Sequence, residues 1–305
     1  MRSTLLQRYS LPLYFLLTLG LTWLLWVPAA LLLFPEGSEA ASAFSMPVVV
    51  VQTLGAALPS LVALVLVRFL HGKRQLRELF GRVRIWRGDK RWYAIAILLA
   101  PLLAACSIGI RAWLDEDFVV AATSPLGEIA AEIGVVGLLL TLPLMFVGLL
   151  FSSPILEEFG WRGYALPKLQ RRFNALASGS ILGVATALWQ APLVLAGGES
   201  LPPLLLGAVG TSILMTWIFN STGGNLLMAI LFHGSLAVAL TVLHPGGQDL
   251  VLPGLTLVVA SLVVLQYGSR DLARQPRFRW PDGQALHDDL PSDGRQPRAR
   301  TSPVS

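Results

Sequence analysis

The sequence predicts an all-α membrane protein, a bundle of about eight transmembrane helices. Its 305 residues are 54% hydrophobic and only 13% charged, and the mean hydropathy of +0.64 lies above the range of soluble domains. The apolar residues also gather in long runs separated by shorter polar segments. That pattern is typical of helices that cross a bilayer.

The first apolar run, from Leu11 to Phe34, has 24 residues and no charge, so it is long enough to cross about 30 Å of hydrocarbon as a helix. A cleaved signal typically has only about 7–15 apolar residues, which favours a retained span. Seven further apolar runs follow, at about 46–67, 92–110, 133–156, 176–196, 202–219, 226–243 and 250–267.

The positive charges are distributed asymmetrically between the two sides of these spans. If the N-terminus is cytoplasmic, the inner segments contain every Lys and Arg except Arg111. These segments are 1–10, 68–91, 157–175, 220–225 and 268–305. We therefore expect a plasma (inner) membrane protein with both termini in the cytoplasm. The same asymmetry explains the pI of about 9.8 without a nucleic-acid partner.

Two regions differ in composition from the spans. The segment 68–91 mixes basic residues with Phe80 and Trp86, as expected of an amphipathic segment on the lipid bilayer. Residues 268–305 are rich in Arg, Asp, Pro, Gly and Ser and lack apolar periodicity. We therefore expect residues 1–267 to form a polytopic membrane domain and 268–305 a disordered cytoplasmic tail.

The most informative charges are Glu157, Glu158 and Arg162, which follow an apolar run with no ionisable side chain from Ile133 to Leu156. On a helix, Glu158 and Arg162 are four residues apart and can pair on one face. Glu157 points about 100° away from that face. These positions favour a braced pair and a second carboxylate that is available as a general base. In isolation, however, the same charges favour a cluster that anchors a helix end at the interface.

His233 is the other ionisable candidate inside a predicted span. It lies eight residues beyond Asn225, which corresponds to about 12 Å at 1.5 Å per residue. The carboxylates reach a similar depth only if the fourth span continues past Leu156, with its exit nearer Arg171 and Arg172. Buried ionisable residues in spans usually face the bundle interior and mark functional sites.

Three stretches resemble the CAAX-processing and bacteriocin-processing (CPBP) family of intramembrane endopeptidases. EEFGWRGYALPKL at 157–169 resembles the family's first motif, EExxxR. ALWQAPL at 187–193 is similar to the second motif, and TGGNLLMAILFH at 222–233 to the approach to the third. The resemblance covers roughly residues 135–240.

The resemblance implies a role for each matching residue. Glu157 would activate a water, Glu158 and Arg162 would brace the site, and His233 would position the water or bind a metal. Zinc is the candidate cofactor, with Glu157 and His233 as candidate ligands. The spans that carry these residues would line a cavity open to the cytoplasm.

Two positions depart from the family pattern. Gln190 stands where the second motif has a His, and Ala237 stands where the third motif, HxxxN, has an Asn. The amide of Gln190 both donates and accepts, so it can still bind a water or polarise a carbonyl, or it can join helices as interhelical polar glue.

Three functions stay open on these residues. The favoured one is an intramembrane endopeptidase that acts on a membrane-associated peptide or protein, either a CAAX protein or a bacteriocin precursor. The second is a pseudoprotease that binds a peptide or confers immunity without cutting, as the two departures suggest. The third is a small-molecule transporter, which predicts two related halves.

Overall fold

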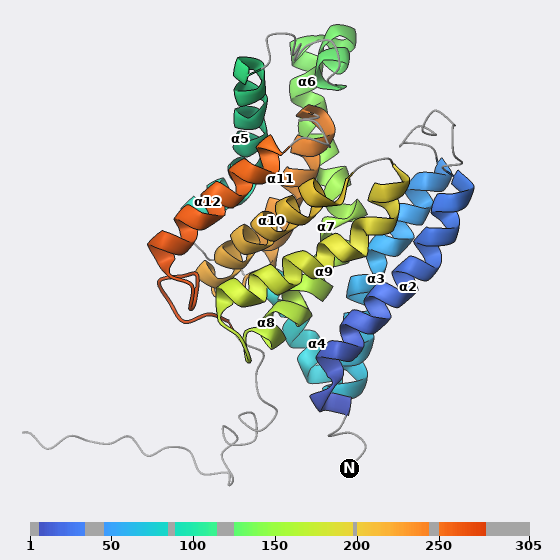
Figure 1. Cartoon of the computed structure of the whole chain (residues 1–305), viewed down its shortest axis with the longest axis vertical. Helices are drawn as coiled ribbons and strands as arrows, with labels where there is room; N and C mark the ends of the chain where they lie inside the picture. The colour runs from blue at the N-terminus through green and yellow to red at the C-terminus, as the bar shows by residue number, and fades with distance from the viewer. Residues whose placement is uncertain are drawn as a thin grey trace, which may run out of the picture.

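The computed structural model describes residues 6–33, 46–84, 89–114, 125–197, 200–243 and 250–278, and every regular element in these ranges is a helix (Figure 1). The elements are α2 (Ser10–Leu33), α3 (Met46–Leu70), α4 (Gly72–Gly81), η1 (Arg82–Arg84), α5 (Lys90–Leu114), α6 (Pro125–Ser152), α7 (Pro154–Gly160), η2 (Trp161–Ala165), α8 (Leu166–Leu169), α9 (Ala175–Ala196), α10 (Leu201–Ser221), α11 (Leu226–Leu243) and α12 (Val251–Tyr267).

Six of these helices are long and apolar enough to cross a membrane: α2, α3, α5, α9, α10 and α11. A seventh span is formed if α6 and the helices that follow it are counted as one bent pair, and α12 is a shorter apolar helix. Large apolar side chains face outward, with Leu24 74% exposed and Leu265 82% exposed. The prediction of an all-α membrane protein is therefore confirmed, and its eight runs correspond to these helices.

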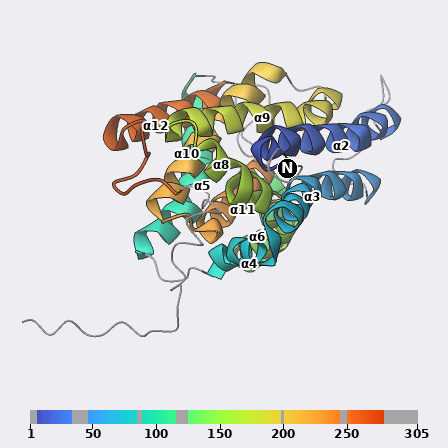
Figure 2. The same ribbon diagram turned by 90° about the horizontal axis from the view of Figure 1, so that it is seen from below.

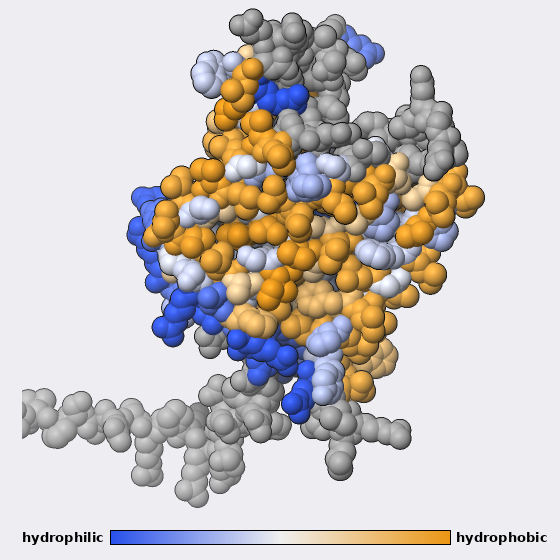
Figure 3. Space-filling model, viewed as in Figure 1, coloured by the Kyte–Doolittle hydropathy of each residue, from blue (hydrophilic) through white to orange (hydrophobic). Residues whose placement is uncertain are grey.

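The helices pack around α11. Figure 2 shows α11 in the middle of the bundle, with α9, α12 and α2 along one side and α5, α6 and α3 along the other, and α11 contacts α5, α6, α7 and α10. The face in Figure 3 is mostly hydrophobic; many of its hydrophilic residues gather at the lower end and the left edge, and a few lie at the upper end. An apolar belt of this kind is the surface expected of a protein that crosses a bilayer.

The fourth predicted span is broken at Ser153. Pro154 is the first residue of α7, where its missing N–H and fixed φ are tolerated, and the two halves meet at an angle of 40°. The helical path nevertheless continues through η2, a π-helical turn, to Leu169. The chain therefore stays helical past Leu156, and the exit of the span near Arg171 and Arg172 stays a prediction.

Close packing fixes α7 against α3 at Gly160. A Cβ atom at this position would lie 2.4 Å from the carbonyl oxygen of Pro59 and 2.7 Å from the hydroxyl of Tyr14. The backbone N–H of Gly160 donates to the Ser60 hydroxyl at 3.2 Å. Only glycine leaves room for this approach, which brings the carboxylate-bearing helix against a membrane span.

We expect Gly160→Ala to lower the free energy of unfolding by about 1–3 kcal/mol, because the added methyl meets backbone that cannot move aside. Chemical unfolding in detergent micelles measures this change. Gly20→Ala is the matched control, since nothing lies within 4 Å of its added Cβ and alanine favours a helix over glycine by about 1 kcal/mol. Equal losses in the two variants would contradict the packing explanation.

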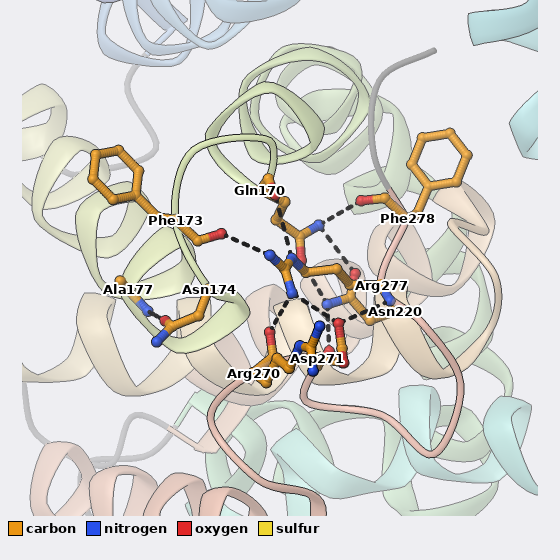
Figure 4. A network of polar contacts seen from close by, with 9 residues as sticks. All are labelled: Gln170, Phe173, Asn174, Ala177, Asn220, Arg270, Asp271, Arg277 and Phe278. Carbon is orange, nitrogen blue, oxygen red and sulfur yellow. Dashed lines mark hydrogen bonds and ion pairs between the residues drawn. The ribbon is translucent and has the colours of Figure 1, made fainter. Parts of the chain in front are cut away.

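A C-terminal strap, residues 268–278, folds back after α12. The guanidinium of Arg277 donates to the carbonyl oxygen of Gln170 at 3.3 Å and pairs with Asp271 at 2.8 Å (Figure 4). Partial burial opposes the charge on Asp271, but the hydrogen bonds and charge of Arg277 outweigh burial and hold the pKa of this carboxyl below its usual value. The pair is therefore charged at neutral pH.

Two amide side chains complete the attachment of the strap. Gln170 and Asn220 donate to each other's side-chain oxygens at 3.1 and 2.7 Å, and both also donate to carbonyl oxygens of the strap. The predicted boundary of the membrane domain at 267 is therefore corrected: the folded chain extends to Phe278. Residues 279–305, the rest of the predicted tail, lie outside the described part of the chain.

Candidate active site

Glu158, Arg162 and His233 form one buried cluster. Arg162 Nη1 lies 3.1 Å from Glu158 Oε1, and His233 Nδ1 lies 2.8 Å from the same oxygen. The side chains of Glu158, Arg162 and His233 are 0%, 4% and 20% exposed. The predicted pairing of Glu158 with Arg162 is present, and α11 brings His233 to the depth of the carboxylates.

The contact with Glu158 orients the imidazole ring of His233. An ionised carboxylate only accepts hydrogen bonds, so Nδ1 of His233 carries the proton and donates it to Glu158. In the neutral ring, Nε2 is then the acceptor, which sets the tautomer. Glu158 is thus a positioning group for the histidine as well as for Arg162.

Glu157 lies beside this cluster and is 5% exposed. Its Oε1 accepts a hydrogen bond from the hydroxyl of Ser153, the residue at the break between α6 and α7. Glu157 is also within coulombic range of His233. The structure therefore brings together both carboxylates, the guanidinium and the imidazole. Among the described residues, Arg162 and His233 form hydrogen bonds with Glu158 and not with Glu157.

Gln190 is not part of that hydrogen-bonded cluster. It is half-buried on α9, and within the described residues it makes no hydrogen bond to Glu157, Glu158 or His233. Its neighbour Trp189 does contact the site helices, with ring centroids 5.8 Å from Trp161. The catalytic role of Gln190 stays a prediction.

The possible metal ligands lie in and beside this cluster. Within the described residues no group of three or more His, Cys, Asp or Glu side chains is arranged to hold an ion. Oε1 of Glu158 and Nδ1 of His233 contact each other. A zinc ion with Glu157 and His233 as ligands stays a prediction.

Two buried polar atoms of the cluster have no protein partner among the described residues: Glu158 Oε2 and Arg162 Nε. Buried polar atoms of this kind are usually satisfied by a bound water or a ligand. They lie on the helical turns that carry Glu157. The cluster thus offers both an acceptor and a donor to a polar molecule.

Two positioning residues were not predicted as part of the site. Ser153 is one of them, through its hydrogen bond to Glu157. Arg82, in the basic segment 68–91, is buried and donates to the carbonyl oxygen of Gly163 at 3.0 Å, and its guanidinium lies 4.1 Å from the ring centroid of Phe278. Burial lowers the pKa of Arg82 to about 10, so it remains a cation at neutral pH. The basic segment 68–91 thus contacts the π-helical turn that follows the carboxylates. The C-terminal strap contacts the same turn indirectly, through the guanidinium of Arg82.

The predicted cavity at the carboxylates stays a prediction. A hollow of about 460 Å³ lies elsewhere, lined by Arg74, Arg77 and Glu78 of α4. The contact of Phe80 on α4 with Phe159 on α7, with ring centroids 5.2 Å apart, links this region to the site helix.

The region that contains these residues is similar to known proteins. Residues 138–239 match the family model described as type II CAAX prenyl endopeptidase Rce1-like. The chain is also similar to CAAX prenyl protease 2 of Methanococcus maripaludis, with 22% identity over 238 residues that cover 74% of this chain and 82% of the relative. The matched region includes the whole cluster and Gln190.

Proposed function

Because residues 138–239 are of the Rce1-like CAAX prenyl endopeptidase family, we propose that this membrane protein hydrolyses a peptide bond of a membrane-associated protein. The observation that carries the proposal is the buried cluster of Glu157, Glu158, Arg162 and His233. Burying two carboxylates in a membrane span is costly and usually marks a functional site.

In the proposed reaction Glu157 is the general base. It takes a proton from a water molecule while the water oxygen bonds to the carbonyl carbon of the scissile peptide. The carbon–nitrogen bond then breaks, and the proton held by Glu157 passes to the leaving nitrogen. The products are a carboxylic acid and an amine, which become a carboxylate and an ammonium group when the acid gives its proton to the amine, so atoms and charges balance without a further reactant.

The neighbouring groups hold and polarise the reactants. Ser153 fixes the carboxylate of Glu157 through its hydrogen bond. Glu158, paired with Arg162, contacts Nδ1 of His233 and so leaves Nε2 as the hydrogen-bonding group for the water in the proposed reaction. A buried site strengthens each of these interactions, since the local dielectric is low.

The name of the similar protein supports a substrate class. The Methanococcus maripaludis protein is named a CAAX prenyl protease, and a C-a-a-X sequence directs prenylation of its Cys. We therefore propose a lipid-modified C-terminal peptide as the substrate. The asymmetric distribution of Lys and Arg supports a plasma-membrane location with the basic end in the cytoplasm.

The direct test uses the purified full chain in lipid nanodiscs and a prenylated peptide ending in C-a-a-X. We expect the wild-type chain to release the C-terminal tripeptide, which mass spectrometry detects. We also expect Gln190→His with Ala237→Asn to raise the rate by roughly tenfold or more, because it restores two water-positioning side chains. Both chains are assayed with added zinc and with a chelator.

The outcomes separate the enzyme from a binding protein. If the wild-type chain binds the peptide without cutting it and only the double variant cleaves, the natural protein is a pseudoprotease. If neither chain cleaves the peptide, the endopeptidase proposal fails for this substrate class.

A further inference from the structure

The helix α4 lies where the chain leaves a membrane span. The span α3 ends at Leu70, and Gly72, with φ of 81°, turns the chain directly into α4. Gln75 and Leu79 face the protein interior, at 5% and 0% exposure. A short helix that starts at the end of a span and buries one face is placed at the membrane interface.

The outer face of α4 is basic. Lys73, Arg74 and Arg77 are exposed, against the single acid Glu78, which pairs with Arg74 at 3.3 Å. That pair is itself open to solvent, with the two side chains 61% and 35% exposed. The face therefore keeps a net positive charge and two guanidinium groups that can bind further acceptors.

The two arginines border a shallow depression that is largely open to the surroundings. Arg74, Arg77 and Glu78 line a volume of about 460 Å³. Guanidinium groups bind phosphate oxygens through parallel hydrogen bonds, and here both come from one face of a helix. The depression therefore has the chemistry to bind a phosphate-bearing headgroup.

Two exposed aromatic side chains lie at the ends of the helices α3 and α4. Phe69, at the end of α3, is 79% exposed, and Phe80, at the end of α4, is 46% exposed. The free energy of such side chains is lower among the acyl chains of a bilayer than in water. A free anion would contact the arginines alone, whereas a lipid contacts both the arginines and the phenylalanines.

We propose that α4 is a binding site for an anionic phospholipid, with Arg74 and Arg77 on the headgroup phosphate and Phe69 and Phe80 against its acyl chains. The site goes beyond the proposed hydrolysis and does not depend on it. Through the contact of Phe80 with Phe159, a lipid bound there lies against the helix that carries the carboxylates.

The test measures lipid retention by native mass spectrometry. The full chain is released from mixed micelles that contain equal amounts of phosphatidylglycerol and phosphatidylcholine. We expect the wild-type chain to retain phosphatidylglycerol, and Arg74→Gln with Arg77→Gln to reduce that preference roughly 30-fold, from the attraction of two basic residues to an anionic surface.

Matched variants separate this site from general charge. Lys90→Gln with Arg91→Gln removes the same charge from exposed positions at the start of α5, and we expect it to keep the preference. Arg74→Lys with Arg77→Lys keeps both charges and must retain most of the binding. Equal losses in the two glutamine variants would overturn the proposal, as would displacement of the lipid by millimolar inorganic phosphate.

Discussion

Glu157→Gln is expected to reduce cleavage of the prenylated C-a-a-X peptide by roughly 10²–10⁴-fold, the usual contribution of a general base. Glutamine has nearly the same shape and can still accept the hydrogen bond from Ser153, but it cannot take a proton from water. The rate is measured in nanodiscs as release of the C-terminal tripeptide over time, at a peptide concentration well below KM.

The control for this variant is Glu132→Gln, which makes the same chemical change at an exposed position on α6. Its rate should equal that of the wild-type chain. A Glu157→Gln chain that unfolds at the wild-type temperature yet cleaves at the wild-type rate would remove Glu157 from the mechanism.

The helices were predictable because a bilayer constrains the sequence strongly. About twenty consecutive apolar residues without charge have few alternatives to a spanning helix, and the runs beginning at Leu11, Met46 and Leu226 correspond to α2, α3 and α11. The pairing of Glu158 with Arg162 was equally predictable, since spacing by four residues is a local property of one helix.

Features that depend on the packing of separate helices were harder to predict from the sequence. Pro154 indicates a possible break, but the angle of 40° depends on how α7 packs against α3 at Gly160. The choice of Glu158 rather than Glu157 as the partner of His233 depends on the rotation of α11, which no local pattern specifies.

The C-terminal strap shows why composition misled the prediction there. Residues 268–278 have few apolar side chains to bury, which favours disorder. They are fixed instead by a hydrogen bond from Arg277 to the carbonyl oxygen of Gln170, by one from the Asn220 amide to a carbonyl oxygen of the strap, and by Phe278 on the guanidinium of Arg82. Such polar contacts between distant segments leave no periodic signal in the sequence.

Arg162→Met is expected to lower the free energy of unfolding by about 3–5 kcal/mol, the usual cost of removing one partner from a buried ion pair. Glu158 is 0% exposed and would keep only His233 as a partner for its charge. Methionine has a similar length, so the variant leaves little empty space. The loss of unfolding free energy therefore comes mainly from the unpaired carboxylate of Glu158. Unfolding of the full chain by denaturant in mixed micelles measures it.

Two comparisons make this prediction specific to burial. Arg74→Met breaks a pair with the same spacing, Arg74 with Glu78, but its side chains are 61% and 35% exposed, so we expect a loss of less than about 1 kcal/mol. Glu158→Gln combined with Arg162→Met removes both buried charges and should recover part of the stability lost in the single variant, because no unpaired carboxylate remains. If Arg162→Met is no more destabilising than Arg74→Met, the buried pair does not stabilise the helical turns that carry the site, and the bracing role of Arg162 fails with it.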